Sequence, residues 1–132
     1  MTEAIGNLKV FVIGSGSIGK RHIKNLRTLG VRYITAFDPR ADRAMEAEAQ
    51  SQVELKSSVE AGLADRPHIA VIATPTSLHS AMALQAAESR SHIFVEKPLS
   101  DRIDPTLDAL TETLRRSGLH SLVGCNMRFH PD

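Results

Sequence analysis

Short apolar runs alternate along this chain with longer segments in which apolar residues recur every three or four positions. The runs are rich in β-branched residues and are bounded by polar or turn-forming residues, which is typical of buried strands. The predicted strands cover residues 9–13, 33–37, 53–55, 69–73, 93–96 and 122–125. The pattern therefore predicts strands that alternate with helices.

The interval after the first run predicts an amphipathic helix over residues 17–29. Its apolar face comprises Ile18, His22, Leu26 and Leu29. Gly30 follows at a position where a left-handed C-cap is expected. On this face we expect His22 to be a core histidine whose hydrogen bonds are satisfied.

The last interval predicts a helix that begins at Asp104 and Pro105, a capping carboxylate followed by a residue suited to the first turn. The helix is expected to end before Gly118. Its buried stripe comprises Leu107, Leu110 and Leu114. The alternation of strand and helix thus continues to the last predicted strand.

This alternation favours an α/β fold, a doubly wound parallel sheet with helices on both faces and the strand order 3-2-1-4-5-6. The run over residues 53–55 is short and polar, so we expect it at an edge of the sheet. No repeat or low-complexity tract interrupts the pattern. One domain is therefore expected over residues 1–132.

Composition excludes several classes of function. Hydrophobic residues make up 42% of the chain, and the apolar run near the N-terminus is too short for a signal or membrane segment, which favours the cytoplasm. The net charge is +1 and aromatic residues make up 4%, so a nucleic-acid surface is not supported. The one cysteine, Cys125, has no partner for a disulfide, and no cluster has metal-ligand spacing. No nucleic-acid, membrane or metal partner is therefore expected.

A glycine motif stands between the first strand and the first helix. It comprises Gly14, Ser15, Gly16, Ser17, Ile18 and Gly19. The first glycine suits a tight turn, the second lets the backbone approach a pyrophosphate, and the third lets the helix pack closely on the sheet. The helix N-terminus offers free N–H groups and partial positive charge to phosphates. Because strand, motif and helix occur together, a dinucleotide site is predicted rather than a turn that binds nothing.

Asp38 ends the second strand, nineteen residues beyond Gly19, where an acid that hydrogen-bonds the adenosine ribose is expected. A carboxylate there repels a 2′-phosphate, so NAD is the predicted cofactor. Arg40 could pair with such a phosphate and keeps NADP as an alternative. Arg40 is equally consistent with a solvated charge in a loop.

Three further turns follow predicted strands: ATPTSLH at 73–79, VEKPLS at 95–100 and GCNMRFHP at 124–131. Parallel strands end on the same edge of a sheet, so these turns converge with the glycine motif. Together with GSGSIGKRH they resemble the N-terminal half of the glucose-fructose oxidoreductase, inositol dehydrogenase and MocA (Gfo/Idh/MocA) family, over nearly the whole chain. The resemblance implies the Rossmann domain of an NAD(P)-dependent dehydrogenase acting on a carbinol or carbonyl of a sugar-like or cyclitol substrate.

Glu96, Lys97 and Pro98 match the Glu-Lys-Pro motif of that family. The resemblance implies that Lys97 is the catalytic residue, beside the nicotinamide and in contact with the reacting oxygen. An ammonium group aimed at that oxygen stabilises the charge that develops there as hydride leaves. Glu96 and Lys97 are accordingly assigned to the cofactor site. Taken alone, the tripeptide is more often a surface turn after an edge strand.

Other positions match family segments that lie under or beside the cofactor. They are Thr74, Pro75, Thr76, His79 and Asn126. For His79 a structural role and a place near the cofactor are weighed equally. Cys125 is expected to be a small buried residue rather than a nucleophile.

The family continues with a second α/β domain, absent from this sequence, that covers the nicotinamide and supplies most substrate contacts. Without it the reactants are neither oriented nor shielded from water, so we expect cofactor binding without useful turnover. A small-molecule substrate is expected only with that domain, and uncovered apolar surface favours self-association. One alternative to a dehydrogenase is a non-catalytic regulatory or scaffold module that binds dinucleotides. Another is a methyltransferase using S-adenosylmethionine, which would not need the Glu-Lys-Pro motif.

Overall fold

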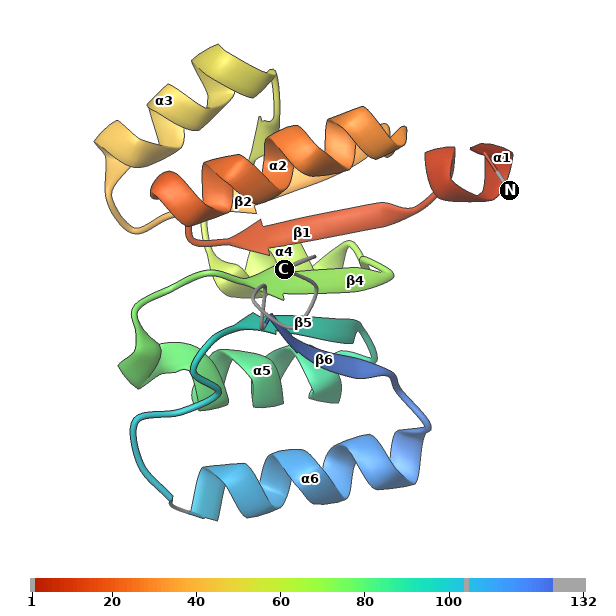
Figure 1. Ribbon diagram of the computed structural model, residues 1–132, viewed down its shortest axis with the longest axis vertical. Coiled ribbons are helices and arrows are strands. Elements are labelled where there is room, and N and C mark those ends of the chain that lie inside the picture. The colour runs from red at the N-terminus through yellow and green to blue at the C-terminus, as the bar shows by residue number, and fades with distance from the viewer. Residues whose placement is uncertain (1, 104, 125–132) are drawn as a thin grey trace, which may run out of the picture.

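A parallel sheet forms the centre of the computed structural model, which describes residues 2–103 and 105–124 (Figure 1). Its strands are β1 (Lys9–Ile13), β2 (Tyr33–Phe37), β3 (Glu54–Leu55), β4 (Ile69–Ile72), β5 (His92–Glu96) and β6 (Ser121–Gly124). All neighbouring strands are parallel, in the order β3-β2-β1-β4-β5-β6. The predicted doubly wound fold and strand order are therefore confirmed.

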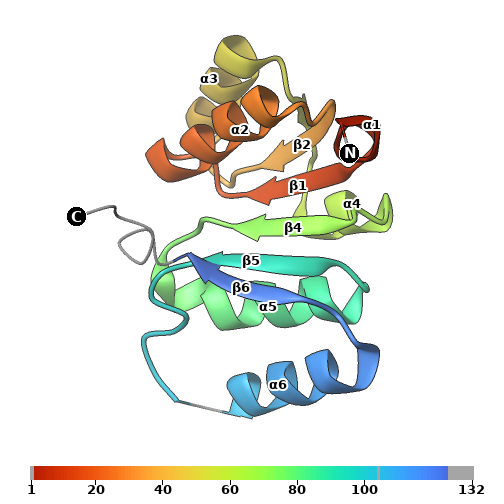
Figure 2. The ribbon, with the colours of Figure 1, turned by 45° about the vertical axis from the view of Figure 1, so that its right-hand side comes forward.

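Helices cover both faces of the sheet. They are α1 (Thr2–Gly6), α2 (Ser17–Leu29), α3 (Ala41–Ser51), α4 (Val59–Ala64), α5 (His79–Glu88) and α6 (Pro105–Ser117), with a 3₁₀ turn η1 (Thr76–Leu78) before α5. Helices α2 and α3 pack on one face, and α4, α5 and α6 on the other (Figures 1 and 2). The arrangement places two hydrophobic layers around the sheet.

Strand β1 contributes to both hydrophobic layers. Val10 and Val12 pack in the layer that contains Ile23 of α2, whereas Phe11 and Ile13 pack in the layer that contains α4 and α5. None of these four strand residues is more than 1% exposed. Burial on both faces explains why this strand is a continuous hydrophobic run in the sequence.

Most element boundaries follow the sequence prediction. Helix α2 covers residues 17–29, and Gly30 caps it in the left-handed conformation at φ 101°. Strand β3 is a two-residue edge strand, as expected. Helix α6 ends before Gly118, and its predicted cap Asp104 lies outside the described residues. Local pattern and capping residues are thus sufficient to place these elements.

The predicted apolar face of α2 is only partly correct: Leu26 packs against the core, but the other three residues do not form its buried face. Ile18 and Leu29 are 45% and 65% exposed, whereas Gly19 and Ile23 face the sheet. The helix turns this face inward because Gly19 packs against the turn that precedes the helix. His22 has a hydrogen-bond partner, yet its side chain is 23% exposed, so it is not a core histidine. In α6 only Leu110 of the predicted stripe is fully buried.

Within residues 2–103 and 105–124, no helix combines the length and the apolar character needed to cross a bilayer.

Substitution of Gly62 in α4 by alanine should destabilise the protein. At an interior helix position, alanine ordinarily makes the protein more stable than glycine does, by roughly 0.5–1 kcal/mol. Here the added Cβ would overlap the buried ring of Phe11, so we expect the free energy of unfolding in urea to fall by roughly 1–3 kcal/mol. Adding Phe11→Leu should recover part of this loss, and strictly additive effects of the two substitutions would contradict the overlap.

Candidate functional site

A cavity of about 530 Å³ lies where β1, β2 and β4 end. Many of the residues predicted as cofactor contacts line it: Gly14, Gly16, Ser17, Ile18, Asp38, Arg40, Thr74 and Pro75. These residues come from the turns after three different strands, which the sheet order brings to one edge. The structure therefore gathers most of the predicted site in one place.

Other predicted residues lie outside this cavity. Ser15 and His79 are buried, at 0% and 1% exposure. Glu96 and Lys97 line a second cavity, of about 280 Å³, between α2, β5 and β6, and Ile18 lines both cavities. Gly19 and Thr76 line neither of these two cavities, and Asn126 and Cys125 lie outside the described residues.

Two glycines of the turn are required by the fold itself. Gly14 has φ 97°, and a Cβ there would lie 2.6 Å from the carbonyl oxygen of Ala73. A Cβ on Gly19 would overlap the carbonyl oxygen of Gly14. These contacts let the chain leave β1 sharply and bring the start of α2 against the turn.

Gly16 differs from both, because nothing in the fold requires a glycine there. Its φ of −70° is accessible to any residue, and the nearest atom to an added Cβ would be Arg43 Nη1 at 3.6 Å. Gly16 is also the N-cap of α2 and offers no side-chain cap, so the first N–H groups of the helix stay open. This open helix N-terminus suits an anion.

Asp38 ties the glycine turn to the end of β2. Its Oδ2 accepts a hydrogen bond from the backbone N–H of Ser15, and its Oδ1 accepts one from the N–H of Arg40, both at 2.8 Å. The residue is 8% exposed and lines the larger cavity. Each carboxylate oxygen retains a lone pair, so Asp38 can also accept from a ribose hydroxyl.

Two buried hydroxyl groups beside the turn lack partners. Ser15 Oγ and Thr74 Oγ1 make no hydrogen bond with the described residues. Buried polar groups are nearly always paired, because an unpaired one has lost its water without compensation. Thr74 lines the larger cavity, and Ser15 lies between Gly14 and Gly16, which also line it, so both hydroxyls belong to the region that fits a dinucleotide.

The arginine that sequence reasoning selected is already paired. Arg40 Nη2 lies 2.9 Å from Asp42 Oδ2, and both side chains are exposed. This hydrogen bond lowers the pKa of the Asp42 carboxyl. The guanidinium of Arg40 is therefore held by its own loop.

Arg43 is the residue that sequence reasoning missed. It is half-buried, lines the larger cavity, and its guanidinium lies beside Gly16. Among the described residues its side chain has no ion pair or hydrogen bond, whereas nearby Lys20 is paired with Glu46 at 2.8 Å. Both arginines line the cavity, and only the fold shows that Arg40 is paired with Asp42 in its own loop whereas Arg43 lies beside Gly16.

Across the part of the chain that the structure describes, no group of three or more His, Cys, Asp or Glu side chains could hold a metal ion.

Residues 8–124 match the profile described as "Oxidoreductase family, NAD-binding Rossmann fold", the Gfo/Idh/MocA family. The chain belongs to this family. The match spans every strand of the sheet and the whole glycine turn. NAD is accordingly the cofactor of this fold in Gfo/Idh/MocA proteins, and the dinucleotide features described above fit it.

Relatives of this chain are named as an oxidoreductase or as dehydrogenases. The chain is 37% identical to the uncharacterized oxidoreductase YrbE and 35% identical to scyllo-inositol 2-dehydrogenase (NAD(+)), both of Bacillus subtilis. Each alignment covers 91% of this chain and 36% of the relative, so the chain spans little more than a third of either protein. The WlbA dehydrogenase from Bordetella pertussis, solved with NADH and UDP-GlcNAcA, superposes with a TM-score of 0.85 at 25% identity, over 93% of this chain and 37% of that one.

Gly16→Ala should weaken NAD binding without unfolding the chain. The methyl group would occupy the space above the helix N-terminus, so we expect at least a tenfold rise in the Kd measured by titration calorimetry, or about 1.4 kcal/mol. Stability in urea should change by less than about 1 kcal/mol, the range of N-cap substitutions. Gly14→Ala is the contrasting variant and should lose stability. Unchanged NAD affinity in Gly16→Ala would count against the site.

Arg43→Ala should reduce affinity for NAD about tenfold, because a charge-assisted hydrogen bond to a phosphate is lost. Arg40→Ala is the matched control: its guanidinium is paired with Asp42, so we expect less than a twofold change. Calorimetric titration of the two variants with NAD and with ADP-ribose measures both effects. Equal affinities in Arg43→Ala and the unmodified chain would show that Arg43 does not contact the cofactor.

Proposed function

We propose that this chain is the NAD-binding half of a dehydrogenase that transfers hydride between NAD and a carbinol or carbonyl of a sugar-like or cyclitol compound. The observation that carries the proposal is the open position above Gly16, beside two buried hydroxyls without partners. Relatives named as inositol dehydrogenases, and a neighbour solved with NADH and a UDP-sugar, support the substrate class.

The proposed cofactor contacts come from the turns after β1, β2 and β4. Open N–H groups at the start of α2 and the guanidinium of Arg43 would hold the pyrophosphate. The hydroxyls of Ser15 and Thr74 would gain their missing partners. Asp38 would accept from the adenosine ribose, and its negative charge disfavours the additional phosphate of NADP.

Lys97 is the proposed catalytic residue. The nicotinamide supplies or accepts the hydride. Lys97 is exposed at the end of β5, and its ammonium would stabilise the negative charge that develops on the substrate oxygen. The proton that leaves the carbinol oxygen on oxidation can pass to Lys97 only while its side chain is the neutral amine, because an ammonium group has no lone pair to accept it.

Turnover requires more than the described residues provide. Both cavities are open, and the relatives are nearly three times longer than the matched segment. Substrate orientation and exclusion of water are large contributions to rate, and we propose that a second polypeptide segment provides them. The chain alone is then expected to bind NAD without efficient hydride transfer.

The proposal is tested in two steps. The purified chain should bind NAD and NADH, but not S-adenosylmethionine, in calorimetric titrations. Residues 1–124 should then replace the matching segment of the Bacillus subtilis scyllo-inositol 2-dehydrogenase, and NADH formation from scyllo-inositol should be followed by absorbance. We expect activity that Lys97→Met reduces by a factor of roughly a hundred or more.

Each step can contradict the proposal. A folded chain with no affinity for NAD would refute the cofactor site. A chimera that binds NAD but is inactive, or whose activity is indifferent to Lys97→Met, would favour a non-catalytic dinucleotide-binding module. His120→Ala is the control, because His120 is exposed just before β6, at the end of the strands opposite the turns of the site.

A further inference from the structure

Two histidines from different helices hold the residues on either side of Lys97. Nε2 of His22, on α2, lies 2.5 Å from Oε1 of Glu96. Nδ1 of His79, the first residue of α5, lies 2.7 Å from the carbonyl oxygen of Pro98. Lys97 is the residue between these two anchors. Its own side chain has no ion pair or hydrogen bond among the described residues.

The His22 anchor is built from three structural elements. The ring of Phe94, on β5, meets the His22 ring edge-on with centroids 5.2 Å apart, which restricts the orientation of the imidazole. Gly124, on β6, pairs with Glu96 in the strand register. A Cβ on Gly124 would lie 2.8 Å from the Phe94 ring and 3.3 Å from Glu96 Oε1, so the glycine leaves the space that the pair occupies.

The His79 anchor joins two turns of the site. Its Nε2 lies 2.8 Å from the carbonyl oxygen of Thr74, while its Nδ1 faces the carbonyl of Pro98. Both contacts involve acceptors, so both are hydrogen bonds at the same time only when each ring nitrogen carries a hydrogen. The residue is 1% exposed, so water does not compete for these positions. His79 thereby connects the turn after β5 to the turn that lines the larger cavity.

We propose that His22 and His79 are positioning residues that fix Lys97 relative to the bound dinucleotide. This inference rests on the proposed function, in which Lys97 lies beside the nicotinamide. A lysine side chain is long and flexible, so its reach is defined only if its backbone is fixed. His22 fixes Glu96 to the helix whose N-terminus faces the phosphates, and His79 fixes Pro98 to the Thr74 turn. The two histidines do not themselves need to touch the cofactor.

The geometry predicts that loss of either histidine anchor lowers the affinity for NADH but not the affinity for ADP-ribose. ADP-ribose lacks the nicotinamide, so its affinity reports the glycine turn and the ribose site but not Lys97. The experiment measures Kd for NADH and for ADP-ribose by calorimetry on the 132-residue chain, in the reference variant Lys97→Ala and in His22→Ala and His79→Ala. Lys97→Ala should weaken NADH binding roughly tenfold and leave ADP-ribose unchanged.

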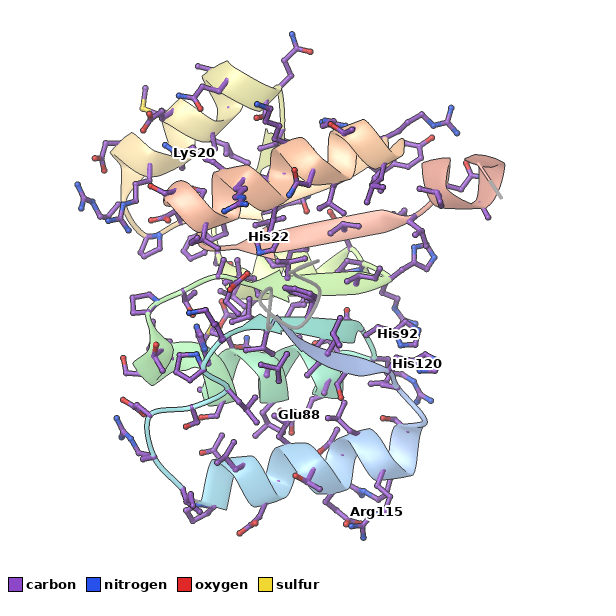
Figure 3. The ribbon with its side chains drawn as sticks, in the orientation of Figure 1. Lys20, His22, Glu88, His92, Arg115 and His120 are labelled. Carbon is purple, nitrogen blue, oxygen red and sulfur yellow. The ribbon has the colours of Figure 1, made fainter. Side chains whose placement is uncertain are left out.

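We expect His22→Ala and His79→Ala to weaken NADH binding roughly three- to tenfold, with ADP-ribose affinity within about twofold of the unmodified chain. His22→Gln keeps an N–H donor for Glu96 and should restore most of the NADH affinity. His120→Ala is the control for loss of an imidazole elsewhere. Figure 3 shows His120 and His92 together at the far end of the strands from the turns of the site.

The outcomes separate this inference from the proposed function. If Lys97→Ala leaves the ratio of the NADH and ADP-ribose affinities unchanged, the placement of Lys97 in the proposed function fails. If Lys97→Ala changes the ratio but the histidine variants do not, or if they weaken both ligands equally, the positioning role is refuted. Should His79→Ala fail to fold, the His22 variants decide, because that side chain lies near the surface.

Discussion

Close packing between the end of β1 and the start of α2 determines how the cofactor end of this molecule is built. No side chain fits at Gly19, because the helix begins directly against the carbonyl of Gly14. This contact places the N-terminus of α2 against the turn and brings Ser15 within reach of Asp38, the residue that follows the neighbouring strand β2. The open helix N-terminus, the buried hydroxyl of Ser15 and the carboxylate of Asp38 all take their places from it.

The alternation of apolar runs and helical segments was sufficient to predict the sheet order and the bounds of α2. The rotation of α2 was not predictable, because His22 and Ile18 fit an apolar stripe in the sequence, whereas the packing of Gly19 turns another face inward. The pairing of His22 with Glu96 joins residues 74 positions apart and depends on the order of the strands. Sequence spacing contains neither piece of information.

The sequence predicted which turns form the candidate site, but it did not predict that the site is divided between two cavities. The glycine turn, Asp38 and Thr74 share one cavity, while Lys97 lines another on the far side of Ile18. Around that second cavity the sheet face is only partly covered by the described residues, and Leu122 is 47% exposed. In the proposed function, a cofactor that reaches from Asp38 to Lys97 passes the glycine turn, which then connects cofactor recognition with the proposed chemistry.

The double hydrogen bond of Asp38 has a consequence for redesign of coenzyme preference. Its carboxylate accepts from Ser15 and Arg40 through separate oxygens, so this residue braces two loops and also lines the cavity proposed to hold the ribose. Replacing Asp38 with a small neutral residue, to admit the 2′-phosphate of NADP, would remove the negative charge that repels this phosphate. It would also remove the two hydrogen bonds that brace the loops. A change of coenzyme in this protein therefore requires a substitute acceptor for the Ser15 amide, such as the isosteric asparagine, before a new cation is introduced.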